Sequence, residues 1–141
     1  MNKLFDIVII GAGTKGKRIA KKLAKDYDVA VIDPSLVAID GVTRINREAI
    51  YVAYVRGIIG VILDGESSPE IFAKRLIIAA PSVKFLPANF YNLDSDGKVI
   101  INQAGQLPAL KPLVYVANKI AIGYGSTVET TLVEAVKEGL K

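Results

Sequence analysis

The stretch FDIVIIGAGTKGKRIAKKLAKDYDVAVIDP, residues 5–34, constrains the fold more than any other part of this sequence. Two short apolar runs within it, IVII and VAVI, have the composition of parallel strands that are buried on both faces. Residues 15–25 between them have helical periodicity, with Ile19 and Leu23 four positions apart. Small residues form a stripe on an adjoining face of this helix: Gly16, Ala20 and Ala24. The stretch therefore predicts a strand, a turn, a helix that lies close to the sheet, and a second strand.

The turn carries the pattern G-x-G-x-x-G, formed by Gly11, Gly13 and Gly16. In such a unit the first glycine allows a tight turn, the second lets a pyrophosphate approach the backbone, and the third permits close contact between helix and strand. The N-terminus of the helix offers free N–H groups and the positive end of its dipole to the phosphates. The predicted phosphate-binding residues are Gly11, Ala12, Gly13, Thr14, Lys15 and Gly16.

Asp33 ends the second apolar run, twenty residues after Gly13. A carboxylate at this position can accept both hydroxyls of an adenosine ribose. Its charge would oppose a 2′-phosphate by roughly 1–4 kcal/mol at contact distance. Asp33 and the neighbouring Pro34 are therefore predicted to bind the adenosine part of FAD or NAD rather than NADP. A glycine turn that binds nothing is the alternative, because a fold does not guarantee a ligand.

The middle of the chain predicts strands rather than helices. Residues 57–65 (GIIGVILDG) and 70–80 (EIFAKRLIIAA) are expected to be strands joined by the turn-rich ESSP. The preceding INREAIYVAYVRG fits either a short helix or a strand. NLDSDG, residues 92–97, predicts a plain turn and not a calcium loop, because the acidic residue that closes an EF-hand loop is missing. The runs KVIIN and LVYVAN, at 98–102 and 113–118, are further expected strands.

The last element is expected to be an amphipathic helix from Ser126 to about Leu140. Ser126 and Glu129 fit a capping box, in which each side chain binds the backbone N–H of the other residue. Its expected apolar face consists of Val128, Leu132, Val133 and Val136.

Composition excludes several kinds of chemistry. Neither cysteine nor histidine is present among the 141 residues, which excludes disulfides, thiol nucleophiles, a histidine base and the usual zinc sites. No metal site is expected. The lack of cysteine, together with many Ile, Val, Lys and Tyr residues, resembles the composition of thermophile proteins. The sequence lacks a signal-peptide pattern and an apolar run long enough to cross a membrane, so we expect a cytoplasmic protein without membrane insertion.

The chain has a net charge of +4, and a third of its 18 basic residues lie on the first predicted helix. Its basic residues are Lys15, Lys17, Arg18, Lys21, Lys22 and Lys25. Such a cluster can attract phosphate or nucleic acid, but a solvated helix face is the simpler interpretation. Aromatic residues that would stack on bases make up only 7% of the chain, so no nucleic-acid partner is expected.

The order of these segments resembles the FAD-binding half of the two-dinucleotide-binding-domain flavoproteins. This superfamily includes the pyridine nucleotide-disulfide reductases and the alpha subunits of sarcosine oxidase and of dye-linked proline dehydrogenases. The segments that carry the resemblance are GAGTKG, KRLIIAAPSVKFLP, LDSDGKVIIN, LKPLVYVANKIAIGYG and STVETTLVEAVKEGLK. The resemblance implies an α/β fold, a Rossmann-like parallel sheet with a small β-meander. It also implies a single FAD/NAD(P)-binding domain over residues 1–141, without the central NAD-binding domain of those enzymes.

The resemblance implies FAD as cofactor, with weaker contacts from Ala80 and Asn118. Where the family has Thr-Gly after an alanine, this chain has Ala80-Pro81, and where it has Gly-Asp, this chain has Ala117-Asn118. Asn118 can bind a ribityl hydroxyl only through a neutral hydrogen bond, which is about half as strong as a charge-assisted one. The final helix would direct its N-terminus at the flavin, whose reduced form is negatively charged. The adenosine half of the site therefore matches the family better than the flavin half.

Three functions are compatible with these observations. The first is an FAD-binding oxidoreductase-like protein or subunit whose substrate site is supplied by a partner chain. Catalytic residues are unknown, since Tyr124 and Lys119 are only the nearest titratable groups in the flavin-side segment. The second is an NAD-binding regulatory domain, because the opening residues also look like the domains that gate potassium uptake. The third is a structural subunit that has lost its cofactor. In each case the apolar composition predicts a homo- or hetero-oligomer.

Overall fold

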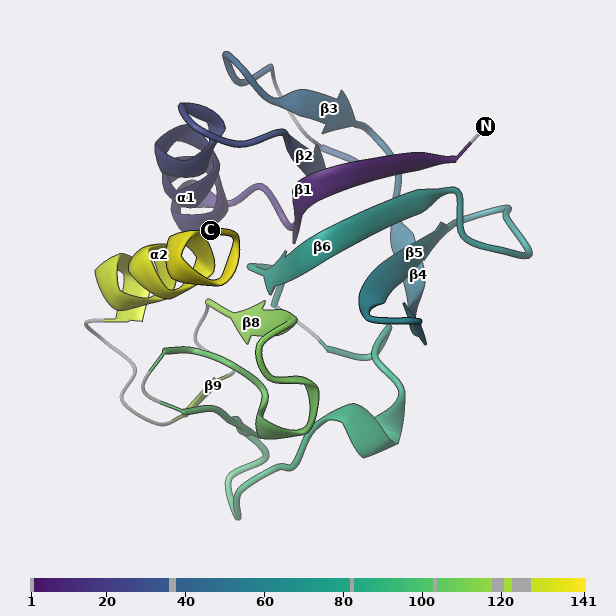
Figure 1. Ribbon diagram of the computed structural model, residues 1–141. Helices are drawn as coiled ribbons and strands as arrows, with labels where there is room; N and C mark the ends of the chain where they lie inside the picture. The colour runs from purple at the N-terminus through teal and green to yellow at the C-terminus, as the bar shows by residue number, and fades with distance from the viewer. Residues whose placement is uncertain (1, 36–37, 82, 103, 118–120, 123–127) are drawn as a thin grey trace.

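The computed structural model describes residues 2–35, 38–81, 83–102, 104–117, 121–122 and 128–141. Within these residues, two α-helices and nine strands follow one another along the chain, as coloured in Figure 1. Their bounds are β1 Lys3–Ile10, α1 Thr14–Ala24, β2 Val29–Ile32, β3 Thr43–Ile45, β4 Ala49–Val55, β5 Ile58–Leu63, β6 Ile71–Ile78, β7 Val99–Ile100, β8 Val114–Val116, β9 Ala121–Ile122 and α2 Val128–Gly139. Short 3-10 turns cover Ala88–Phe90 and Pro108–Leu110.

The main sheet has the strand order β3-β2-β1-β6-β5-β4, and β8 also pairs with β6. The strands β3, β2, β1, β6 and β8 are parallel, as expected for continuous apolar runs such as IVII and VAVI. In contrast, β4, β5 and β6 form an antiparallel meander. β6 belongs to both parts, because Ile71–Ala73 pair with β5 and Leu76–Ile78 pair with β8. The predicted Rossmann-like sheet with a small meander is confirmed.

The ambiguous segment INREAIYVAYVRG is a strand over most of its length. A tight turn joins it to β5, and both turn residues, Arg56 and Gly57, have positive φ angles of 49° and 87°. Two consecutive positive φ angles match the right-handed twist of a two-stranded hairpin. The expected strands at 57–65 and 70–80 correspond to β5 and β6, with slightly shorter bounds.

Two hydrophobic clusters lie on opposite sides of the sheet. The helices α1 and α2 lie side by side on one face (Figure 1), where Ile7 and Ile9 pack with Ile19, Leu23 and Leu132. The other cluster joins the parallel strands to the meander and to the segment after β6. Its fully buried members include Val8, Val52, Ile59, Leu76, Leu107 and Val114. The apolar face predicted for the last helix is confirmed for its described side chains, since Leu132, Val133 and Val136 are buried.

Polar contacts fix both ends of α2. Near its N-terminus, Glu129 accepts hydrogen bonds from Arg18 and Lys22 of α1. Near its C-terminus, Arg75 of β6 donates to the carbonyl oxygen of Gly139 at 2.7 Å. The side chains of Arg18 and Lys22 are about half exposed, as expected for a solvated helix face, but they also bind the second helix. The predicted capping partner Ser126 lies outside the described residues.

The NLDSDG segment forms the expected plain turn. Asp94 Oδ1 accepts hydrogen bonds from the backbone N–H groups of Asp96 and Lys98, so the aspartate stabilises its own loop. Among the residues that the structure describes, no group of three or more acidic side chains lies close enough together to hold a metal ion. Neither helix in the described part of the chain has the length and apolar character needed to span a membrane.

Candidate dinucleotide-binding site

Gly11 and Gly16 are required by the contacts of the fold itself. Gly11 has a φ of +105°, and a Cβ there would lie 2.6 Å from the backbone nitrogen of Ala80. A Cβ at Gly16 would collide with the carbonyl oxygen of Gly11. The glycine-rich turn therefore packs directly against the end of β6, and the helix packs against the turn. A larger residue at either position would force β1, α1 and β6 apart.

Gly13 differs from its two neighbours in the motif. Its φ of −67° and ψ of −177° are open to any residue, and a Cβ there would meet no described heavy atom within 4 Å. Nothing in the described backbone therefore requires glycine at this position. The missing side chain leaves free space beside the turn, as a pyrophosphate that approaches the backbone would need.

The N-terminus of α1 has the properties of an anion site. Gly13 is the N-cap residue and has no side chain that could cap the helix. No residue in the first turn is acidic, so no carboxylate of the helix itself neutralises the positive end of the dipole. Thr14 is the first residue of this turn and is exposed, and Lys15 is partly exposed. Free N–H groups, the dipole and open space beside Gly13 thus occur together.

Asp33 lies directly beside the turn, at the carboxyl end of β2. Its Oδ2 accepts a hydrogen bond of 2.7 Å from the backbone N–H of Ala12. Its Oδ1 accepts the backbone N–H of Ser35 at 2.8 Å and the Ser35 hydroxyl at 2.7 Å. Partial burial opposes ionisation, but the hydrogen bonds from Ser35 and Ala12 and the charge of Lys17 together hold the pKa of Asp33 below its ordinary value. The carboxylate is therefore ionised at neutral pH.

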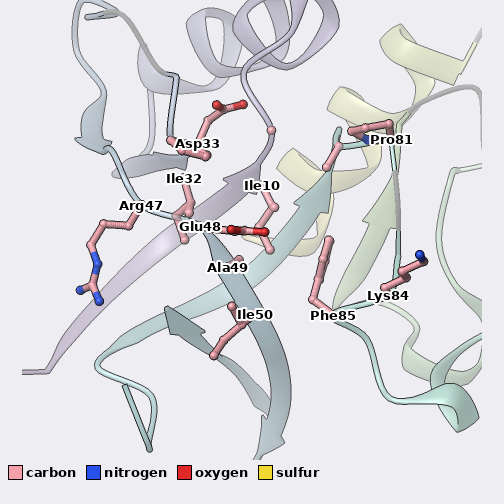
Figure 2. Close-up of a pocket in the computed structure, with 13 residues that line it drawn as sticks. Ile10, Ile32, Asp33, Arg47, Glu48, Ala49, Ile50, Pro81, Lys84 and Phe85 are labelled. Atoms are coloured by element: carbon pink, nitrogen blue, oxygen red, sulfur yellow. The ribbon is translucent and has the colours of Figure 1, made fainter. Parts of the chain in front are cut away.

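A cavity of about 720 Å³ opens next to Asp33 (Figure 2), within the size range of cofactor pockets. It lies between the ends of β1, β2 and β6 and the start of β4. Its lining residues are Ile10, Gly11, Ile32, Asp33, Pro34, Arg47, Glu48, Ala49, Ile50, Ala80, Pro81, Lys84 and Phe85. Most of the lining residues are apolar, and the charged ones are Asp33, Arg47, Glu48 and Lys84. Figure 2 shows the side chains of Arg47 and Lys84 on opposite sides of the view.

The structure brings most of the predicted site residues together. Gly11, Asp33, Pro34 and Ala80 line the cavity. Ala12 binds Asp33, Gly13, Thr14 and Lys15 form the N-terminal end of α1, and Gly16 is buried beneath the turn. Four of the ten predicted residues thus share one cavity and five more lie on the turn and helix beside it. Asn118 lies outside the described residues, as do Lys119 and Tyr124.

Sequence reasoning did not identify the wall formed by the start of β4 and the segment after β6. This wall consists of Arg47, Glu48, Ala49, Ile50, Lys84 and Phe85. Arg47 is held in place by Glu66, at 3.3 Å, and by the carbonyl oxygen of Asp64. The only sequence signal for this wall is indirect. A strand assignment for INREAIYVAYVRG would have placed its start at the edge of the predicted site.

Comparisons with known proteins identify the fold. No family model and no curated protein matches the chain. Among solved structures, the thioredoxin reductase from T. acidophilum matches with a TM-score of 0.72 at 11% identity, over 99% of this chain and 97% of that one. Thermovibrio ammonificans THI4 matches with a TM-score of 0.52 at 13% identity, over 97% of this chain and 87% of that one. L-proline dehydrogenase from P. horikoshii matches with a TM-score of 0.50 at 15% identity, over 72% of this chain and 27% of that one.

The chain has the Rossmann-like fold of FAD/NAD(P)-binding domains. The predicted fold class is confirmed by the likeness to thioredoxin reductase, which extends over nearly the whole of this chain. At 11–15% identity these likenesses concern the arrangement of the backbone, and they do not show which residues of this chain have which roles. The function must therefore be argued from the site.

Proposed function

We propose that this chain is a single dinucleotide-binding domain that holds FAD, as an oxidoreductase-like protein or as a subunit of one. The observation that carries the proposal is Gly13. Gly11 and Gly16 are explained by contacts within the chain, whereas a Cβ at Gly13 would meet no described atom. A ligand that lies against this backbone would account for the third glycine. The diphosphate fits that description, because it also matches the uncapped helix end.

The residues around the cavity fit the remainder of an ADP group. Asp33 can accept a ribose hydroxyl, and its ionised state opposes a 2′-phosphate, which favours FAD or NAD over NADP. Apolar walls that include Ile10, Ile32 and Phe85 provide a surface for the purine. Ala80 lies beside Gly11, and both line the cavity. FAD, when bound, would supply the redox chemistry, while these residues bind and orient its ADP half.

We propose FAD rather than NAD because of the topology between β2 and the last helix. The potassium-uptake type of regulatory domain, our alternative, should alternate strands and helices after its first unit. In the described residues, β3, β4, β5 and β6 follow β2 with no α-helix between them. The antiparallel meander β4-β5-β6 is the arrangement that the flavoprotein resemblance implies. The fold of thioredoxin reductase and of L-proline dehydrogenase supports the same choice.

A partner chain is proposed to supply the substrate site, in the manner of a sarcosine oxidase alpha-type or dye-linked proline dehydrogenase subunit. No described cavity-lining residue is a histidine, a cysteine or a tyrosine. The strand β4 exposes four large apolar side chains, Ile50, Tyr51, Tyr54 and Val55, at 36–53% of their surface. Tyrosine-rich apolar surface is typical of protein interfaces. Since Ile50 also lines the cavity, a partner on this strand would lie beside the cofactor.

The test is ligand binding to the purified chain. We expect a yellow protein that releases FAD on denaturation, or an apoprotein that FAD stabilises by about 2.7 kcal/mol at a hundredfold excess over its dissociation constant. Gly13→Val should abolish binding, because the new side chain fills the space beside the turn. Stabilisation by NAD but not by FAD would select the regulatory-domain alternative. A response to neither nucleotide would leave the structural subunit that has lost its cofactor, and binding that survives Gly13→Val would show that the site is misplaced.

A further inference from the structure

The hydrogen-bond acceptors of Asp33 are mostly occupied within the chain. A carboxylate offers about four lone-pair positions, two on each oxygen. On Oδ1 both are taken by Ser35, through its backbone N–H at 2.8 Å and its hydroxyl at 2.7 Å. On Oδ2 one is taken by the N–H of Ala12 at 2.7 Å. Among the donors in the described part of the chain, these three leave one acceptor position of Asp33 open, and it is on Oδ2.

The two oxygens also differ in what surrounds them. Oδ2 lies at the glycine-rich turn, since its donor is Ala12, and Gly11 of that turn lines the cavity. Oδ1 is held by Ser35, which is exposed and is not among the described residues that line the cavity. The Ser35 hydroxyl must be the donor in this contact, because an ionised carboxylate can only accept. Ser35 thus fixes the orientation of the carboxylate and occupies both acceptor positions of Oδ1.

From this arrangement we infer that Ser35 determines how the site recognises ribose: it limits Asp33 to one of the two ribose hydroxyls, which Oδ2 accepts. The inference rests on the proposed binding of an ADP group and specifies how that group is recognised. It differs from the sequence-based expectation that Asp33 accepts both hydroxyls. Removal of the Ser35 hydroxyl would free one acceptor position on Oδ1, next to the one already open on Oδ2. The carboxylate could then accept both hydroxyls of the vicinal diol.

The inference is tested by calorimetric titration of ADP, 2′-deoxy-ADP and 3′-deoxy-ADP. For the wild-type chain we expect one deoxy analogue to bind within twofold of ADP and the other to bind about tenfold more weakly, since a hydrogen bond to a charged group is lost. For Ser35→Ala we expect both analogues to bind about tenfold more weakly than ADP. Ser35→Thr keeps the hydroxyl and should retain the wild-type pattern. Thermal unfolding of all three proteins checks that the exposed substitutions leave the fold intact.

The possible results separate this inference from the proposed function. Failure of the wild-type chain to bind ADP or FAD would overturn the proposed function, and the inference with it. If ADP binds, three patterns would overturn the inference alone. In the first, the wild-type chain binds both deoxy analogues more weakly than ADP. In the second, it binds both as tightly as ADP. In the third, Ser35→Ala still discriminates against only one of the two analogues.

Discussion

The ion-pair cluster between α1 and α2 gives a prediction whose size and pH dependence can both be worked out. Glu129 accepts hydrogen bonds from Arg18 at 2.8 and 3.0 Å and from Lys22 at 2.9 Å. The Glu129 side chain is only 18% exposed, whereas Arg18 and Lys22 are 51% and 44% exposed. We expect Glu129→Gln to destabilise the chain at neutral pH, because it removes the charge that both cations share.

The expected loss follows from the pKa of Glu129. The hydrogen bond from Arg18 lowers this pKa most. Partial burial raises the pKa and Lys22 lowers it further, so that it falls from 4.5 to about 2. A fall of that size corresponds to about 3 kcal/mol at 1.36 kcal/mol per pH unit. Because water screens the two half-exposed cations, we reduce this to about 1–2 kcal/mol in the free energy of unfolding.

The sign of the pH dependence is fixed by the direction of this shift. The pKa of Glu129 is lower in the folded chain than in the unfolded chain, so its contribution is fully present above pH 4.5. The contribution decreases as the pH falls below that value and is lost near pH 2. The difference in the free energy of unfolding between the wild-type chain and Glu129→Gln should thus be constant above about pH 5.5. At pH 3 it should fall to about two-fifths of its neutral value.

Urea denaturation of both proteins between pH 3 and pH 7 measures this difference directly. Glu138→Gln is the matched control, because Glu138 and Lys141 form an ion pair in the same helix region in which both side chains are 70% exposed. We expect that control to change the free energy of unfolding by less than about 0.5 kcal/mol. The reasoning is refuted if Glu129→Gln is as stable as the wild-type chain at pH 7. It is also refuted if the difference between them is the same at pH 3 and pH 7.

Two further predictions concern the fold and the site. Gly11→Ala should strongly lower the midpoint of thermal unfolding, because its Cβ would lie 2.6 Å from the backbone nitrogen of Ala80. Gly13→Ser should leave the midpoint unchanged or raise it slightly, because serine is a good N-cap residue. Equal midpoints for the two variants would contradict this contrast. Tyr115→Phe should cost about 1–3 kcal/mol in urea denaturation, because the buried Nε2 of Gln106 donates to the Tyr115 hydroxyl at 3.1 Å and would lose its acceptor. A neutral effect would mean that water or another group replaces the hydroxyl.

Sequence reasoning succeeded where the controlling interactions are local. The order strand, glycine turn, helix and strand depends on continuous apolar runs, on helical periodicity and on a glycine that tolerates a φ of +105°. These are properties of residues close together in the chain. The same holds for the turn at Asp94, whose side chain accepts N–H groups two and four residues ahead. For INREAIYVAYVRG the local pattern was indecisive, and pairing with β5 made it a strand.

The position of Asp33 followed from the sequence, but its hydrogen bonds did not. Its place after β2 is set by spacing, whereas the number of acceptors left for a ligand depends on the donors that surround it. Ala12 is 21 residues away in the sequence, and it reaches Oδ2 only because β1 and β2 pair in parallel. The contacts of Glu129 show the same limit. Its hydrogen bond with Arg18, which is 111 residues away, follows from the packing of the two helices and not from a local pattern.

The sequence by itself determined the glycine-rich turn, the parallel strands and the acidic residue beside them, because each rests on the chemistry of a short segment. Only the tertiary structure decided which residues form the far wall of the cavity, how many hydrogen bonds Asp33 can still accept, and what holds α2 in place. Those features depend on distances between segments that are far apart in the chain. Such distances are set by the packing of the whole sheet and both helices, which no short pattern encodes.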